Sequence, residues 1–200
     1  MVIDSIRREG KYEILGIIDT AENIGKDVTG VVIIGSDADI AKISKDESAK
    51  FIITVGSVGS PETRIRLFEA AYTAGLMPVN VIDPTAVVSK GAHVGLGNYI
   101  GVRVVLNTGA TIENNVIINT GAIIEHDCVI GDSVHIAPGV VLSGGVTVGR
   151  GSHIGTGAVV IQGVKIGENT LIGAGSVVVG NIDGNLTAYG NPCRKAEKNK

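Results

Sequence analysis

The sequence has almost no aromatic residues and very few cysteines. None of its 200 residues is Trp, two are Phe and four are Tyr, although 44% of the residues are hydrophobic. The core must therefore be built from aliphatic side chains, which suits a narrow interior better than a broad one centred on rings. The two cysteines, Cys128 and Cys193, are too few for a disulfide framework. Cys128 occupies a small-residue position of a repeat, so we expect a structural thiol there.

Charge and the lack of long apolar runs exclude further classes of protein. The formal net charge is −3, and Lys and Arg do not cluster before the last few residues, so nothing favours a nucleic-acid partner. No apolar run approaches the length of about 18 residues that suggests a membrane-spanning helix, and the first residues do not resemble a signal peptide. These absences predict a cytoplasmic protein that binds neither nucleic acid nor membrane.

What the sequence does have is a strict period of six between Ile82 and Val178. An α-helix has a period of about 3.6 and a half-buried strand a period of about 2, so neither explains this repeat. A short fixed period is typical of a solenoid, in which each repeat buries its apolar residue against the repeats on either side. From Ile82 onward, every sixth residue is Ile, Val or Leu: Val88, Val94, Ile100, Leu106, Ile112, Ile118, Ile124, Ile130, Ile136, Leu142, Val148, Ile154, Val160, Ile166, Ile172 and Val178.

A second signal accompanies the aliphatic residues. Small residues recur four positions after many of them, as at Ala86, Ala110 and Ala122, and suit a tight corner. Three six-residue faces would close one triangular coil of eighteen residues. We therefore predict a mainly β protein with a parallel β-helix over residues 81–182, followed by a C-terminal tail over residues 183–200.

Residues 1–80 follow a different pattern, in which apolar strands alternate with helices. We expect helices near residues 2–8, 37–45 and 61–75, and strands near residues 13–19, 31–35 and 51–56. This alternation predicts a small, parallel, Rossmann-like α/β domain. Ligands of such domains bind beyond the carboxyl ends of the strands, which makes Asp19–Thr20 and Gly56–Ser57 candidate binding positions.

The densest group of polar residues in the repeat runs from Asn119 to Asp127. Within it, Asp127 follows His126, and a carboxylate beside an imidazole can fix its tautomer and increase its basicity. In a coil of eighteen residues, Thr108 and Gly144 would stack on His126. Gly144 would leave open space there for an extended ligand.

Two further histidines, His135 and His153, are also eighteen residues apart. They should stack on one edge of the prism, where a ligand lying along its axis could touch both. A plainer interpretation of His93 and His153 is that both are solvated edge residues. Spacing alone also leaves a purely structural role open for His126 and His135.

The sequence contains the segments IID (17–19), TVG (54–56), IDPTA (82–86), IIEHDCVIGDSVHIAPG (123–139) and YGNPCR (189–194). Taken together, they resemble the PglD/NeuD group of hexapeptide-repeat sugar acyltransferases. The chain is most similar to the UDP-4-amino-sugar N-acetyltransferases of that group. The resemblance implies that the β-helix is left-handed, whereas the general preference for right-handed crossovers points the other way.

The resemblance also implies roles for particular residues. The general base falls on His126, and Asp127 takes the place of the acidic neighbour that increases its basicity. Contacts with acetyl-CoA fall on His135, Thr156 and Ala174, to which the coil register adds Gly144. Contacts with a nucleotide sugar fall on Asp19, Thr20, Gly56 and Asn119.

The expected activity is acetyl transfer from acetyl-CoA to the amino group of a UDP-4-amino-dideoxy sugar. The transfer would be direct and without a metal, in a homotrimer whose sites lie at subunit interfaces. Alternatives are O-acetylation of a sialic acid or similar sugar, and a non-catalytic β-helix scaffold. A zinc hydrolase is a further alternative, but the four histidines lack the close pair in sequence that such a site needs.

One departure from the family concerns the N-terminus. The family opens with an apolar strand and a glycine-rich turn that holds the nucleotide sugar at a helix N-terminus. Here the chain begins at Met1-Val2, already inside the helix that would follow. We expect either that the recorded start is late or that this half of the sugar site has been lost.

Overall fold

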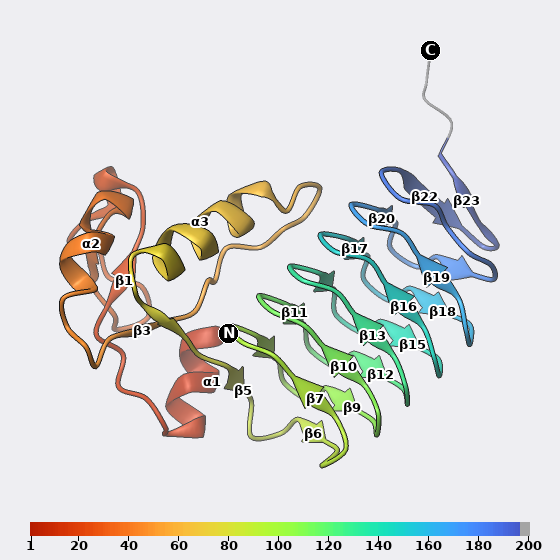
Figure 1. The fold of residues 1–200 in the computed structure, drawn as a ribbon, viewed down its shortest axis with the longest axis horizontal. Coiled ribbons are helices and arrows are strands. Elements are labelled where there is room, and N and C mark those ends of the chain that lie inside the picture. Colours follow the sequence, from red (N-terminus) through yellow and green to blue (C-terminus); the bar gives the residue numbers. More distant parts are fainter. Residues whose placement is uncertain (197–200) are drawn as a thin grey trace.

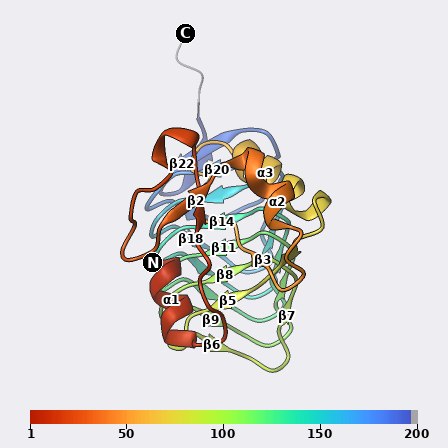
Figure 2. The same ribbon diagram turned by 90° about the vertical axis from the view of Figure 1, so that its left-hand side faces the viewer.

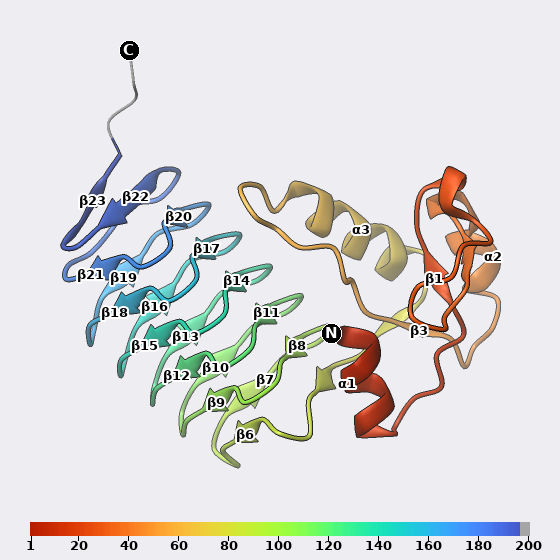
Figure 3. The same ribbon diagram turned by 180° about the vertical axis from the view of Figure 1, so that it is seen from behind.

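The computed structural model describes residues 1–196, in which a smaller N-terminal part lies beside the coils of a long parallel β-helix (Figures 1 and 3). The β-helix has three sheets of short strands. We name each sheet by one of its strands. The β8 sheet contains β5 (Val81–Ile82), β8 (Tyr99–Ile100), β11 (Ile117–Ile118), β14 (His135–Ile136), β17 (His153–Ile154), β20 (Leu171–Ile172), β22 (Thr187–Gly190) and β23 (Cys193–Lys195).

The other two sheets have the same construction. The β9 sheet contains β6 (Val87–Val88), β9 (Val105–Leu106), β12 (Ile123–Ile124), β15 (Val141–Leu142), β18 (Val159–Val160) and β21 (Val177–Val178). The β10 sheet contains β7 (His93–Val94), β10 (Thr111–Ile112), β13 (Val129–Ile130), β16 (Thr147–Val148) and β19 (Lys165–Ile166).

The chain turns at three corners, which we number by the sheet they follow. The first corner follows the β8 sheet and includes residues 101–104, 119–122, 137–140, 155–158 and 173–176. The second corner follows the β9 sheet and includes residues 107–110, 125–128, 143–146 and 161–164. The third corner follows the β10 sheet and includes residues 95–98, 113–116, 131–134 and 149–152.

Each coil is held to the next by parallel backbone pairing in a fixed register. Ile118 pairs with Ile136, and Ile136 pairs with Ile154, so corresponding residues are 18 apart. The hydrogen bond between the side chains of Asn115 and Ser133 joins neighbouring coils with the same spacing. The second residue of each strand points inward, and those from Ile100 to Val178 form one buried aliphatic core. Burying one such side chain stabilises the fold by roughly 1.5–3 kcal/mol. The predicted period of six and the predicted coil are therefore confirmed.

The N-terminal part alternates strands with helices, as predicted, and its strands pair in parallel. However, they form two separate two-stranded sheets, β1–β2 and β3–β4. The strands predicted at 13–19 and 51–56 are shorter in the structure because few of their residues find a hydrogen-bonded neighbour. The elements are α1 (Val2–Glu9), β1 (Ile17–Ile18), the 3-10 helix η1 (Ala21–Asn23), β2 (Ile33–Gly35), the 3-10 helix η2 (Asp37–Asp39), α2 (Ile40–Ile43), β3 (Lys50–Phe51), α3 (Glu62–Thr73) and β4 (Met77–Pro78).

A buried carboxylate, Asp83, holds α1 against the first coils (Figure 2). Ser5 Oγ donates a hydrogen bond to Asp83 Oδ2 at 2.6 Å, and Arg8 forms an ion pair with the same oxygen at 2.5 Å. Thr85 donates from its backbone N–H and its hydroxyl to Asp83 Oδ1. Burial alone would raise the pKa of Asp83, but the bonds from Ser5 and Thr85 and the charge of Arg8 lower it. The IDPTA segment (82–86) therefore has a structural role, because it joins α1 to the β-helix.

A buried arginine, Arg64, ties α3 and the preceding loop to the third corner. Its Nε donates to the Asn115 carbonyl at 3.0 Å, and its Nη1 donates to the carbonyls of Ile53 (2.7 Å) and Val55 (3.0 Å). Burial lowers the pKa of Arg64 to about 10, so the guanidinium stays charged near neutral pH. The loop that leads to Gly56 is thus fixed on the β-helix by one cation.

His135 and His153 point outward from the β8 sheet, yet both are buried. They pair directly between β14 and β17, and their ring centroids lie 4.7 Å apart at 87°. The predicted stacking is confirmed, but it occurs on a flat sheet and not on an edge, and His153 is not a solvated residue. Burial, His153 and the nearby Arg64 together lower the pKa of His135 to about 4, and burial also lowers that of His153.

The C-terminal end extends the β8 sheet. β22 pairs in parallel with β20, and β23 folds back antiparallel on β22. Residues 187–195 of the predicted tail are therefore part of the β-helix end, whereas residues 197–200 lie outside the described residues. Across the part of the chain that the structure describes, no helix combines the length and apolarity needed to cross a bilayer.

The buried His135 should make the fold sensitive to acid. Its pKa falls from 6.5 to about 4 on folding, so the unfolded chain binds more protons between these pH values. Stability linked to His135 is thus fully present above pH 6.5 and decreases as the pH falls toward about 4, by on the order of 3 kcal/mol. Urea unfolding at pH 7 and pH 4.5 should show a smaller loss in His135→Gln than in the parent protein.

The matched control is His93→Gln, because His93 also begins a strand but is exposed. Its unfolding free energy should follow the parent's at both pH values. An equal loss of stability in His135→Gln and in the parent protein would contradict the linkage.

Candidate functional site

His126 and Asp127 lie at the second corner, in the loop between β12 and β13, and face solvent. The His126 Nδ1 and Asp127 Oδ2 atoms are 2.9 Å apart, and the two side chains are 59% and 71% exposed. An ionised carboxylate can only accept a hydrogen bond, so Nδ1 carries the proton in this contact. Nε2 of the neutral ring then has a free lone pair, which can accept a proton from a bound substrate.

Asp127 has a left-handed backbone with φ 60°. The corresponding residues of the neighbouring coils, Gly109, Gly145 and Gly163, have φ values of 73°, 69° and 70°. Glycine is the residue that adopts this conformation at least cost, and Asp and Asn are among the few others that tolerate it. The coil that carries His126 therefore keeps a carboxylate where the neighbouring coils have glycine.

Two glycines provide the space that this pair occupies. A Cβ on Gly144 would lie 2.5 Å from both Cε1 and Nε2 of His126. A Cβ on Gly109 would overlap the Asp127 carboxylate. The structure thus brings His126, Asp127 and Gly144 together, and the predicted stacking of Gly144 on His126 is confirmed.

Other predicted site residues lie at the first corner. Asn119 is buried there, and its Oδ1 accepts a hydrogen bond from the Thr120 N–H at 2.8 Å. Thr156 and Ala174 are exposed at the same corner of later coils. One face of the prism, of about six residues and roughly 20 Å, separates this corner from His126. Asn119, expected on the same face region as His126, lies at the neighbouring corner instead, and one chain does not bring these groups together.

His135 begins β14, directly before the first corner, and is buried. With a pKa of about 4, its imidazole is neutral near pH 7. Neither ring nitrogen has a hydrogen-bond partner within residues 1–196. His135 is therefore suited to form hydrogen bonds as a neutral group, and it is a poor candidate for a base near neutral pH.

Of the three predicted positions in the N-terminal part, two adjoin a strand, whereas Gly56 lies five residues beyond Phe51, the last residue of β3. Asp19 and Thr20 come directly after β1, and Asp19 Oδ1 accepts hydrogen bonds from the Thr20 N–H (2.6 Å) and Asn23 Nδ2 (3.2 Å). The bonds from Thr20 and then Asn23 lower the pKa of Asp19, so the carboxylate is ionised near neutral pH. Gly56 is exposed, and a Cβ there would meet nothing within 4 Å.

Sequence reasoning missed two residues that shape these surroundings. Gly109 leaves space for the Asp127 carboxylate, and this role could have been predicted from the sequence because Gly109 lies one coil before Asp127. Arg64 gave no signal, since a single arginine in an amphipathic helix is ordinarily solvated. As for metals, residues 1–196 contain no group of three or more His, Cys, Asp or Glu side chains placed to hold an ion.

Both halves of the chain match known protein families. Residues 109–144 and 145–180 match the bacterial transferase hexapeptide family (six repeats), and residues 1–71 match the PglD N-terminal domain. No curated protein was found to match the chain. One family thus corresponds to the hexapeptide repeat and the other to the N-terminal α/β part.

Solved structures match the chain over almost its full length. A perosamine N-acetyltransferase from Caulobacter crescentus, with one histidine replaced by asparagine and in complex with CoA and GDP-perosamine, is 34% identical. The match covers 98% of this chain and 91% of that chain, with a TM-score of 0.92. The acetyltransferase domain of PglB from Neisseria gonorrhoeae is 31% identical, with coverages of 98% and 93% and a TM-score of 0.90.

A third structure, WeeI from Acinetobacter baumannii, is 25% identical, with coverages of 98% and 93% and a TM-score of 0.87. The β-helix is left-handed, as the resemblance implied. Because relatives with more than 30% identity match both the N-terminal part and the β-helix, the chain belongs to the PglD-type family of hexapeptide-repeat sugar acyltransferases.

Proposed function

We propose that the protein transfers the acetyl group of acetyl-CoA to the amino group of a nucleotide-linked 4-amino-dideoxy sugar, with His126 as the general base. The observation that carries this proposal is the exposed contact of His126 with Asp127, in which the imidazole packs over Gly144, a residue without a side chain. The solved relatives support the substrates, because one is in complex with CoA and GDP-perosamine and another with acetyl coenzyme A. The resemblance favours a UDP sugar, and the perosamine enzyme a GDP sugar.

The chemistry needs only one positioned base. Nε2 of His126 takes a proton from the sugar amine as its nitrogen attacks the thioester carbonyl. The new C–N bond forms, the C–S bond breaks, and CoA leaves as its thiolate, which is then protonated. Asp127 stabilises the resulting imidazolium through Nδ1, 2.9 Å away. Because His135 is neutral with a pKa of about 4, it would contact the bound substrates without taking this proton.

We assign the remaining site residues in the same way. Thr156, Ala174, Gly144 and His135 would contact acetyl-CoA, and Asp19, Thr20, Gly56 and Asn119 would contact the sugar nucleotide. The first group includes exposed residues of the first corner, and His126 lies at the second corner. A complete site therefore needs the first corner of one chain beside the second corner of another.

The outer surface of the β9 sheet supports such an assembly. The first residue of every strand in this sheet points outward and is aliphatic: Val87, Val105, Ile123, Val141, Val159 and Val177. The equivalent positions of the β10 sheet are mostly polar or charged: His93, Thr111, Val129, Thr147 and Lys165. An apolar stripe between the two corners suits burial against a second copy, as in the homotrimer that the resemblance implies.

The first test of the proposed reaction is an acceptor panel. Acetyl-CoA is mixed with a UDP-4-amino-4,6-dideoxy sugar, GDP-perosamine or free sialic acid, and CoA release and product mass are followed. We expect an amino sugar to be acetylated, and His126→Ala to lower kcat/KM by roughly 100-fold or more. Acetylation of sialic acid alone would replace N-transfer with O-transfer, and a fully active His126→Ala would exclude His126 as the base.

A second prediction uses the space beside His126. Gly144→Ala would place a methyl group 2.5 Å from Nε2 and push the ring aside, so kcat should fall by on the order of 100-fold. Gly180→Ala is the matched control, because a Cβ at Gly180 meets nothing within 4 Å. Both variants should fold, by circular dichroism. Equal kcat values for the two would show that the space beside Nε2 is not used.

A third prediction concerns assembly. Val141→Lys, in the middle of the aliphatic stripe, should convert a trimer into monomers and abolish turnover, because it places a charge in a buried interface. Thr147→Lys, on the next strand of the same coil, is the control and should keep the trimer. Light scattering after size exclusion measures the mass. A Val141→Lys protein that remains trimeric and active would rule out the β9 sheet as the interface.

A further inference from the structure

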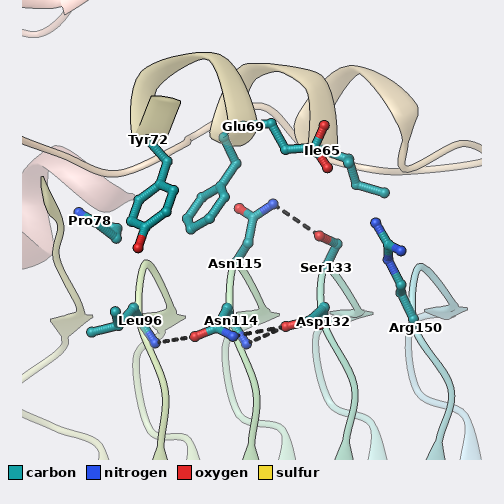
Figure 4. A pocket seen from close by; sticks show the side chains of 11 residues that line it. Ile65, Glu69, Tyr72, Pro78, Leu96, Asn114, Asn115, Asp132, Ser133 and Arg150 are labelled. Carbon is teal, nitrogen blue, oxygen red and sulfur yellow. Dashed lines mark hydrogen bonds between the residues drawn. The ribbon is translucent and has the colours of Figure 1, made fainter. Parts of the chain in front are cut away.

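A groove runs along the third corner, between that corner and helix α3, and Figure 4 shows its lining. Its volume is about 310 Å³, which is at the lower end of the range of small-molecule sites. Four successive coils form its floor, so it extends over about 14 Å at the usual strand spacing. None of the residues assigned to acetyl transfer lines it.

A buried amide projects into this groove. The Asn115 side chain is only 2% exposed, and its Nδ2 donates to Ser133 Oγ at 3.0 Å. Its Oδ1 has no hydrogen-bond partner among the described residues, and in Figure 4 it points away from Ser133, toward the Tyr72 end of the groove. The Asn115 carbonyl is held by Arg64, so the side chain is anchored at its base. A buried carbonyl oxygen of this kind calls for a donor from a ligand or from water.

The two ends of the groove differ in chemistry. At one end the Tyr72 ring is exposed and lies parallel to Phe68, with centroids 6.3 Å apart and planes at 10°. At the other end Arg150 extends toward α3, and it makes no ion pair in residues 1–196 (Figure 4). Between them, Asp132 Oδ1 accepts hydrogen bonds from the backbone N–H and Nδ2 of Asn114.

From this arrangement we propose that the groove is a binding site for a short uncharged saccharide, separate from the acetyl-transfer site. A sugar ring presents C–H groups to an aromatic face and hydroxyl groups that both donate and accept. The groove offers an aromatic ring, acceptors on Asp132 and Glu69 and donors on Arg150 at its surface, and the unpartnered Asn115 Oδ1 is buried in its wall.

The charges of the groove argue against other ligands. Asp132 and Glu69 carry two negative charges against the single positive charge of Arg150, which disfavours a phosphate or nucleotide. The charged side chains of Asp132, Glu69 and Arg150 disfavour a hydrocarbon chain, which would take them out of water without offering a hydrogen bond. A neutral ligand with hydroxyl groups satisfies the acceptors and the donors together.

The groove also lies away from the two corners that the proposed reaction uses. His126 is at the second corner, and Thr156 and Ala174 are at the first. No residue assigned to acetyl transfer lines the groove, so substitutions can test saccharide binding and acetyl transfer separately. The groove would hold a glycan on the same protein that modifies a sugar.

Binding is tested with the full-length protein on an array of immobilised neutral and acidic oligosaccharides, followed by calorimetry with the best-bound glycan. We expect a neutral glycan to bind, and Tyr72→Ala to weaken binding about tenfold. Arg150→Gln should weaken it as well. Tyr189→Ala is the matched control, because Tyr189 is 57% exposed and Tyr72 is 56% exposed, and Tyr189 lies outside the groove.

The outcomes separate this site from the acetyl-transfer site. His126→Ala should bind the glycan as tightly as the parent, and Tyr72→Ala should acetylate the acceptor sugar at the parent's rate. Absence of binding to every glycan, or equal binding by Tyr72→Ala and Tyr189→Ala, would refute the proposal. Loss of glycan binding in His126→Ala would place the glycan in the acceptor site instead, and preferential binding of UDP or GDP in the groove would overturn the ligand class.

Discussion

The fixed register between coils is the constraint on which the rest of the molecule depends. Most strands contribute only two residues, which could not hold a sheet together by themselves. Each strand is stable because its backbone pairs with the coils before and after it and its inward aliphatic residue joins a continuous stack. A slip of one residue would exchange the inward Ile130 with the outward Val129 and move His126 off its corner.

The three corners have different neighbours, although they are built in the same way. The second corner carries the imidazole and carboxylate, the first presents exposed small residues, and the third is packed against α3. The N-terminal part is joined to this frame by two charged residues, Asp83 and Arg64, whose partners lie far away in the sequence. The coil register thus positions His126 and Asp127, and the two joints position the segments that lead to Asp19 and Gly56.

The β-helix could be predicted from the sequence because its rule is local and repeats. The same counting placed Gly144 beside His126 and paired His135 with His153, and both placements are confirmed. It could not show which outward faces are covered, and the prediction that His153 is solvated is wrong because the side chain is buried. Nor could it find Arg64, whose carbonyl partners come from segments that no short period connects. The lengths of β1 and β3 could not be predicted either, because they depend on pairing with strands that are distant in the sequence.

The glycines at corresponding positions of the second corner distinguish what the fold requires from what the proposed reaction requires. Position 127 belongs to a series in which Gly109, Gly145 and Gly163 adopt the same backbone conformation, so a coil with glycine there closes equally well. Asp127 therefore carries a carboxylate that the fold does not require. During evolution, a single codon change at this position could therefore remove the partner of His126 while leaving a stable protein. Under the proposed mechanism, that substitution yields a protein that is folded but inactive.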